Sequence, residues 1–119
     1  HFYTIWPSFY PTSCITVRKN FFLKFLNYLE PKKFPNLEID ARLCIFAFLN
    51  KSFKIYKKNL TIYNFDHLGI TSKYKKFSFK WWKKRGEAFD YMKLLMKKMK
   101  LKFVPSLDYY VTRLINFFI

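Results

Sequence analysis

The stretch KYKKFSFKWWKKRGEAFDYMKLLMKKMK, residues 73 to 100, contains two different hydrophobic periods. In its first half, aromatic residues alternate with lysine and serine, so that Phe77, Phe79 and Trp81 fall on one face of an extended chain. This period of two predicts a strand over Tyr74 to Trp82. In its second half, apolar residues recur every three or four positions, as on one face of a helix. The stretch therefore predicts a strand followed by a helix, which is typical of an α+β fold.

Three segments predict amphipathic helices. Between Arg18 and Glu30, aromatic and leucine side chains recur at helical spacing until Pro31 stops the run. The helix after Gly86 has acidic residues at its start and lysines at its end, which matches the helix dipole. The third helix, residues 106 to 119, starts at a serine that can cap it, and its polar face is thin. We expect this helix to dock on its own domain or on a neighbouring protein.

Two further segments predict strands. Apolar and charged residues alternate from Leu37 to Arg42, and the chain is then continuously apolar from Leu43 to Leu49. A strand that enters the core fits this pattern, although periodicity alone also allows a buried helix. Residues 53 to 55 and 60 to 62 alternate on either side of Lys57-Lys58-Asn59, which indicates a hairpin.

The length of 119 residues allows one domain, and the hydrophobic fraction of 51% is too high for a disordered chain. We expect a small single α+β domain over residues 13 to 119, with antiparallel strands and about three amphipathic helices. Residues 1 to 12 carry two prolines and several hydroxyls and predict an extended arm. No window reaches the roughly 18 uncharged apolar residues that cross a bilayer, so we expect no transmembrane segment.

The chain is strongly basic, with 23 Lys and Arg against 7 Asp and Glu and a net charge of +16. A charge of this size repels itself in the compact state unless a polyanion neutralises it. The excess is concentrated in residues 51 to 102, where 16 basic side chains face three acidic ones. The sequence therefore indicates a polyanionic partner for the middle of the chain.

The residues that most enzymes use are scarce. His1 is terminal, and the neighbouring pair Asp66 and His67 is more typical of a turn than of a catalytic dyad. Cys14 and Cys44 have no ligand-like spacing, which favours two ordinary reduced thiols over a zinc site. The two glycines are isolated and form no phosphate-binding loop. We expect no enzymatic activity, no metal, no cofactor and no small-molecule substrate.

The segment Lys73 to Arg85 has seven positive charges in thirteen residues, with five aromatic residues between them. Cations bind phosphates and exposed rings stack on unpaired bases, so this composition favours RNA or single strands. The rings equally fit the buried face of a strand whose lysines are solvated. The expected RNA-binding residues are Lys73, Tyr74, Lys75, Lys76, Lys80, Trp82, Lys83, Lys84 and Arg85, with Lys54, Lys57 and Lys58 before them and Lys93, Lys97 and Lys100 on the following helix.

Residue usage also carries information about the gene. Phe, Tyr, Ile, Asn and Lys, whose codons are AT-rich, dominate over 2 Gly and 5 Pro. This residue usage is clearest in FFLKFLNYL at 21 to 29 and in KYKKFSFKWWKKR at 73 to 85. It resembles the residue usage of the mitochondrially encoded ribosomal proteins of protists such as ciliates. The resemblance implies a structural component of the mitochondrial ribosome, in the matrix, that binds rRNA and neighbouring ribosomal proteins.

Two other functions stay open at this point. One is an accessory subunit of a mitochondrial respiratory or ATP-synthase complex, where the charge would face anionic lipid. The other is a stand-alone protein that binds RNA or single-stranded DNA.

Overall fold

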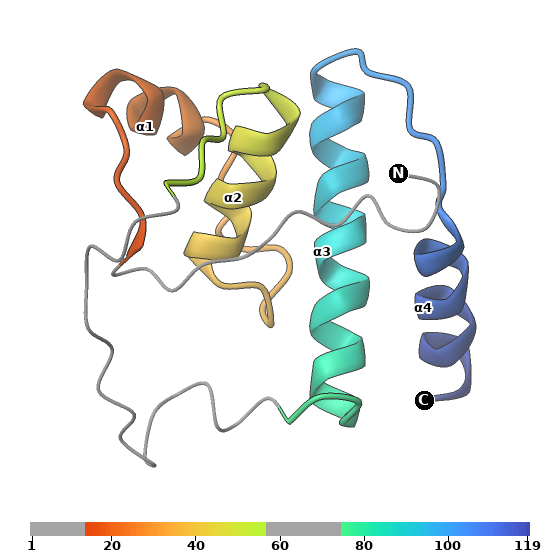
Figure 1. Ribbon diagram of the computed structural model, residues 1–119. Coiled ribbons are helices and arrows are strands. Elements are labelled where there is room, and N and C mark those ends of the chain that lie inside the picture. Colours follow the sequence, from red (N-terminus) through yellow and green to blue (C-terminus); the bar gives the residue numbers. More distant parts are fainter. Residues whose placement is uncertain (1–13, 57–74) are drawn as a thin grey trace.

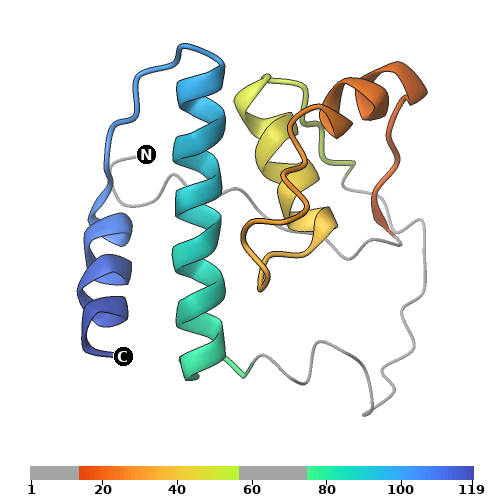
Figure 2. The same ribbon diagram turned by 180° about the vertical axis from the view of Figure 1, so that it is seen from behind.

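A computed structural model of the chain describes residues 14–56 and 75–119. These residues form the four helices α1 (Lys19–Leu26), α2 (Ile39–Leu49), α3 (Phe79–Lys98) and α4 (Leu107–Phe118), and they contain no strand. The described fold is therefore all-helical, and the prediction of an α+β domain with antiparallel strands is wrong. Figures 1 and 2 show α1 and α2 on one side of the long helix α3 and α4 on the other.

The predicted strand between Leu37 and Leu49 is the helix α2. Its seven consecutive residues 41–47 are all buried, because neighbouring elements cover it on every side. A helix that is buried all round has no polar face and so loses the three- to four-residue period that identifies helices in sequence. At its first turn the Asp40 carboxylate accepts a hydrogen bond from the amide of Ala41 at 2.7 Å. The buried-helix alternative was correct.

The predicted strand over Tyr74 to Trp82 is also wrong in its described part. The chain turns at residues 76 and 77, and Ser78 then caps α3, its Oγ accepting a hydrogen bond from the amide of Trp81 at 3.3 Å. The alternation of aromatic residues and lysines is short. The N-cap at Ser78, followed by three residues that a helix tolerates, favours a helix over the strand that the alternation predicts. The helix therefore begins at Phe79 rather than after Gly86, which lies inside it.

Two of the predicted helices are confirmed in position. The first corresponds to α1, which ends at Leu26, before the predicted limit. The last corresponds to α4, where the Ser106 Oγ accepts a hydrogen bond from the amide of Tyr109 at 3.3 Å. The predicted arm over residues 1 to 12 and most of the predicted hairpin lie outside the described residues, and residues 51–56, its described part, contain no strand.

The core lies between α1, α2 and α3. Phe46 of α2 is fully buried, and its ring centroid lies 5.2 Å from that of Phe21, 5.6 Å from that of Phe25 and 5.1 Å from that of Tyr28. On the other side of α2, the residues of α3 that belong to this core are Ala88, Tyr91, Met92 and Leu95. This apolar contact fixes the direction of α3, and with it the directions in which the lysines of α3 point.

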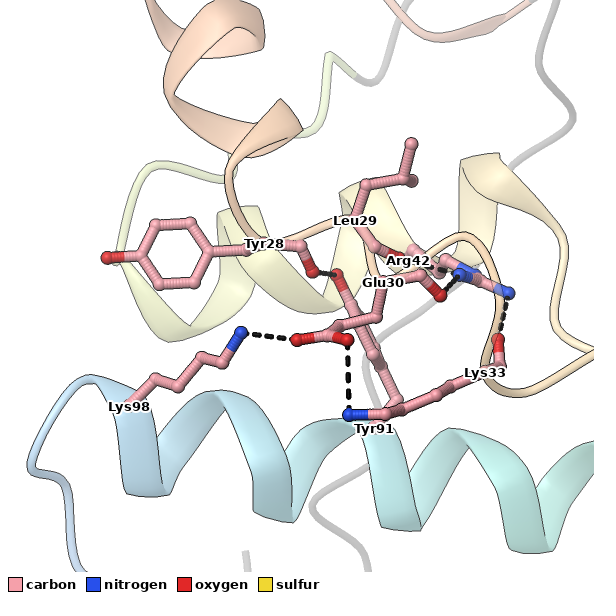
Figure 3. Close-up of polar contacts among 7 residues, drawn as sticks. All are labelled: Tyr28, Leu29, Glu30, Lys33, Arg42, Tyr91 and Lys98. Carbon is pink, nitrogen blue, oxygen red and sulfur yellow. Dashed lines mark hydrogen bonds and ion pairs between the residues drawn. The ribbon is translucent and has the colours of Figure 1, made fainter.

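Arg42 is the buried cation of the fold, with 6% of its surface exposed. Its guanidinium group donates five hydrogen bonds of 2.6 to 2.9 Å to main-chain carbonyls between α1 and α2. Figure 3 includes Arg42 with three of its acceptor residues, Leu29, Glu30 and Lys33. The five carbonyls belong to Leu29, Glu30, Lys33, Phe34 and Leu37. All five guanidinium donors are thus used, and the segment 29–37 is wrapped around one side chain.

Side chains of α3 hold the same segment from the other side. The Tyr91 hydroxyl donates to the Tyr28 carbonyl at 3.0 Å, and burial raises the pKa of this phenol well above its usual value. Glu30 pairs with Lys98 of α3 and, at 3.2 Å, with Lys33 (Figure 3). The hydrogen bond from Lys98, and then that from Lys33, lowers the pKa of the Glu30 carboxyl. The segment 29–37 therefore forms a rigid edge beside α3.

The helix α4 packs on α3 through polar side chains and through the ring of Tyr109, whose centroid lies 5.4 Å from that of buried Phe89. Arg85 of α3 forms an ion pair with Asp108 and donates from Nε to the Thr112 hydroxyl at 3.2 Å. Asn116 donates from Nδ2 to the Trp82 carbonyl at 2.9 Å, and Arg113 pairs with Asp90. The exposed residues of α4 and its end form an outer face made of Leu107, Tyr110, Val111, Leu114, Phe117, Phe118 and Ile119. Most of the apolar stripe of this helix therefore does not pack against the core formed by the described residues.

Gly86 makes the close approach of α3 and α4 possible. A Cβ atom at this position would lie 3.1 Å from Nδ2 of Asn116, which hydrogen bonds to the carbonyls of Trp82 and Thr112 hold in place. We expect Gly86→Ala to lower the free energy of unfolding by about 1 kcal/mol, although alanine is the better helix former by a similar amount.

The matched test measures the effect of Gly86→Ala on the melting temperature twice, once in the unchanged protein and once in a protein that also carries Asn116→Ala. On that background the steric conflict is absent, so Gly86→Ala should raise the melting temperature. A destabilisation of equal size in both backgrounds would contradict the proposed conflict with Asn116.

Candidate nucleic-acid interface

The acidic side chains of the described residues are used within the fold. Four carboxylates form ion pairs. Glu30 pairs with both Lys33 and Lys98, and the other three pairs are Glu38–Lys84, Asp90–Arg113 and Asp108–Arg85. Glu87 accepts hydrogen bonds from the amide and the side chain of Asn36, and Asp40 accepts from the start of α2. In residues 14–56 and 75–119, the basic side chains outside these pairs have no carboxylate to neutralise them, so their field reaches the solvent.

Unpaired lysines and aromatic rings meet where α3 begins. We call this set the basic-aromatic end, and it consists of Lys75, Lys76, Phe77, Lys80, Trp81, Trp82 and Lys83. Its four lysines are exposed, and its two tryptophans are half-buried. The Trp81 and Trp82 rings pack edge to face with their centroids 4.6 Å apart. The predicted RNA-binding residues Lys75, Lys76, Lys80, Trp82 and Lys83 are therefore neighbours at one end of the molecule (Figure 1, green end of α3).

Phe77 is the most exposed ring of this end, with 72% of its surface accessible. Its centroid lies 5.4 Å from that of Trp81 and 6.2 Å from that of Trp82. Nearby, the Lys83 ammonium lies 4.9 Å from the ring centroid of Phe79, which is also exposed. The interpretation of Phe77, Phe79 and Trp81 as the buried face of a strand is therefore wrong.

The backbone of Phe77 has φ of +63°, a conformation that side chains with a Cβ rarely adopt. Phe34 has a similar φ of +61°, but its ring packs edge-on against Tyr91 at 5.7 Å and its carbonyl accepts from Arg42. Core contacts offset the strain at Phe34. At Phe77 the strained backbone instead presents a large apolar ring to solvent, and strain at an exposed position is typical of functional sites.

Lys84 and Arg85 serve the fold. Lys84 pairs with Glu38, which precedes α2, and Arg85 pairs with Asp108 of α4. The Arg85 guanidinium also lies 5.0 Å from the ring centroid of Trp81. These two residues were predicted as RNA ligands, but their contacts join α3 to its neighbours, and we leave them out of the candidate interface.

A second basic surface lies along the other half of α3. An open groove of about 550 Å³ is lined by Lys33, Phe34, Asp90, Lys93, Leu94, Met96, Lys97, Leu101 and Phe103. The Lys93 ammonium lies 5.5 Å from the Phe103 ring centroid and 5.6 Å from that of Tyr109. Burial raises the pKa of the Tyr109 phenol, but hydrogen bonds from Arg113 and Lys93 outweigh it, so the net pKa is lowered.

The sequence identified two of the groove's lysines, Lys93 and Lys97, together with Lys100, which is exposed just after α3. It missed Lys33, Phe34 and Phe103, because these residues lie in connecting segments where no period reveals a shared surface. The one available clue was the basic loop between Pro31 and Pro35.

The remaining predicted RNA-binding residues either lie away from both basic surfaces or fall outside the described residues. Lys54 is exposed and its ammonium lies 5.2 Å from the ring centroid of Tyr56. Lys57, Lys58, Lys73 and Tyr74 lie outside the described residues.

Comparison of the chain with protein-family models, with curated proteins and with solved structures finds no match. No helix in the described part of the chain is both long and apolar enough to span a membrane. Within residues 14–56 and 75–119, no three His, Cys, Asp or Glu side chains gather as they would around a metal ion. Cys14 is exposed, whereas Cys44 is buried in α2. The candidate interface is therefore characterised by its charge and its rings alone.

Proposed function

We propose that this chain is a structural, RNA-binding component of a ribonucleoprotein assembly, and specifically of a mitochondrial ribosome. The observation that carries the proposal is the basic-aromatic end, where four exposed lysines, none paired with a carboxylate among the described residues, lie in the same short stretch of chain as exposed rings. Phosphate groups would neutralise the lysines, and binding would release the counterions that condense on RNA. The mitochondrial ribosome is proposed on residue usage, which resembles that of ribosomal proteins encoded in AT-rich protist mitochondria.

The outer face of α4 supports membership of an assembly. It is uncharged and contains large side chains, among them Phe117, which is 83% exposed. Contiguous apolar patches beyond a few hundred Å² are typical of protein interfaces. A second copy is a poor occupant, because it would bring two chains of net charge +16 together. We propose a neighbouring protein of the same assembly as its occupant.

The RNA proposal predicts the effect of replacing Lys75, Lys76, Lys80 and Lys83 together with glutamine. We expect the affinity for a single-stranded RNA to fall at least tenfold, because four phosphate contacts are lost. The slope of log K against log salt concentration should become shallower by about 2.8, at about 0.7 for each phosphate on a single strand. Binding is measured by fluorescence anisotropy at four salt concentrations.

A control variant carries the same change of charge elsewhere. Lys19, Lys24, Lys32 and Lys51 are exposed and none of them forms an ion pair among the described residues. Their replacement by glutamine should reduce affinity less than threefold. Equal losses in the two variants would show that net charge alone binds RNA and would count against a defined interface.

The assembly is tested in solubilised organelles by gradient sedimentation, with and without RNase, following the chain by mass spectrometry. Co-migration with a ribosomal subunit that RNase abolishes is the expected result. Co-migration with respiratory enzymes that resists RNase, together with flotation on cardiolipin vesicles, would assign the chain to a membrane complex instead.

A further inference from the structure

We infer that the basic-aromatic end binds an unpaired nucleotide by stacking a base on the ring of Phe77, and so selects single-stranded over duplex RNA. The inference rests on the proposed function and names the kind of RNA that this end of the molecule takes. Its basis is one exposed ring, held in a strained backbone conformation against two tryptophans and directly preceded in the chain by Lys75 and Lys76.

The neighbouring rings hold Phe77 in place. Trp81 and Trp82 belong to the first turns of α3, and they pack edge to face on each other and at tilted angles of 54° and 44° against Phe77. Because the two tryptophans are only half-buried and Phe77 is 72% exposed, most of the Phe77 ring remains open to a planar ligand. A ring that is already ordered loses little conformational entropy when a base stacks on it.

The position of Phe77 suits a nucleotide in particular. Lys75 and Lys76 come directly before it, and Lys80 and Lys83 lie on the first turns of α3 after it. All four are exposed. A phosphate next to a base stacked on Phe77 would meet Lys75 or Lys76, while Lys80 and Lys83, on the face of α3 opposite the tryptophans, would meet phosphates farther along the strand. A duplex offers the same phosphates but keeps its bases stacked inside, and so cannot use the ring.

Two properties of Phe77 distinguish this role from packing within the fold. A residue kept for stability should pack its ring against the core, as the partly buried Phe34 does with a similar φ of +61°. Phe77 has the unfavourable φ without the burial. Glycine adopts positive φ without cost, so a phenylalanine at this position makes the fold less stable than a glycine would.

The test uses the full chain and three variants, Phe77→Gly, Phe77→Tyr and Phe79→Ala, on a 12-nucleotide single strand and a hairpin duplex of the same composition. Phe77→Gly should lower the affinity for the single strand about tenfold and leave the affinity for the duplex within twofold. The same variant should melt at an equal or higher temperature, because the backbone strain is relieved. Phe77→Tyr, which keeps a ring, should bind like the unchanged protein.

Phe79→Ala is the matched control, since it removes an exposed ring that lies beneath Lys83 rather than between the tryptophans. It should reduce binding to single strand and duplex equally, and less than threefold. Tryptophan fluorescence gives a second readout, because two of the three tryptophans adjoin Phe77 and should be quenched by the single strand in the unchanged protein.

The outcomes separate the two proposals. Binding of single strand and duplex with equal affinity, or an unchanged affinity in Phe77→Gly, would overturn base stacking while leaving RNA binding in place. A lower melting temperature in Phe77→Gly would instead assign the ring to the fold or to a protein neighbour, and would also overturn it. Absence of binding to either RNA would overturn the proposed function itself.

Discussion

Replacement of Arg42 by lysine is expected to remove about 3–5 kcal/mol of unfolding free energy, a large fraction of the stability of a small domain. The guanidinium group donates all five of its N–H groups to carbonyls of the segment 29–37. A lysine ammonium has three donors at one point and cannot reach carbonyls on opposite sides of the loop. Carbonyls left without a partner in a buried site each cost free energy.

The charge of Arg42 makes the position more sensitive still. The dipoles of five carbonyls stabilise the cation, and the Tyr91 ring centroid lies 5.8 Å from its guanidinium carbon. Arg42→Met removes the charge but leaves every carbonyl unpaired, so it should destabilise the protein as strongly as Arg42→Lys. Loss of the segment 29–37 would also remove Lys33 and Phe34 from the groove beside α3.

Urea denaturation followed by circular dichroism measures this effect. Arg18→Lys is the control, because Arg18 is exposed at the start of α1 and the same substitution there should change stability by less than 0.5 kcal/mol. A loss below 1 kcal/mol in Arg42→Lys would contradict the role of the five hydrogen bonds.

In the sequence, Arg42 is one of the charged residues of the alternating pattern that predicted a strand over Leu37 to Arg42, and the reason why its buried role was not predicted is physical. The five acceptors of Arg42 are main-chain carbonyls. Every residue has such a carbonyl, so the pattern of side chains in the sequence does not predict which ones Arg42 binds. The same limit applies to α2 as a whole, whose buried surface on all sides removes the helical period.

For α4 the sequence predicted the helix correctly and left its docking partner open. The usual assumption that an apolar stripe faces the core fails here, because polar partners on α3 bind the other side. Those partners are more than twenty residues away in the chain, beyond the reach of local patterns. These distant contacts also affected the prediction of the candidate interface. Arg85 lies in a run of lysines and was predicted as an RNA ligand, because its partner Asp108 is not evident from the local sequence.

The candidate site was predictable in its charge but not in its shape. Exposed lysines such as Lys75, Lys80 and Lys97 follow from composition, because so many cations cannot be buried or paired. The exposure of Phe77 depends on a turn with positive φ before α3, and the groove depends on two connecting segments. Such features arise from tertiary contacts.

Asp108→Asn is the second substitution with a large expected effect, a loss of about 2–3 kcal/mol. The side chains of Asp108 and Arg85 are each only 16% exposed, so removal of the carboxylate charge leaves a largely buried cation without its counter-charge. The pair Arg113–Asp90 joins the same two helices but is 36% and 43% exposed. Asp90→Asn should therefore cost less than 1 kcal/mol and serves as the matched control.

A double-mutant cycle of Asp108→Asn with Arg85→Gln, measured by urea denaturation, should give a coupling energy above 1 kcal/mol, and additive losses would contradict the pair. Hydrogen exchange should accelerate in α4 before it accelerates in α2, because only Thr112 of α4 is buried, whereas seven residues of α2 are buried.

The same variant decides what Arg85 does. If Arg85 were an RNA ligand held back by Asp108, Asp108→Asn would release it and raise the affinity for RNA. We expect the affinity of the folded Asp108→Asn protein to stay within twofold of the unchanged protein, because Arg85 remains close to Thr112 and to the Trp81 ring. Arg85, the last cation of the basic run 73–85, would then serve to attach α4, and RNA binding would be left to the exposed lysines of the basic-aromatic end.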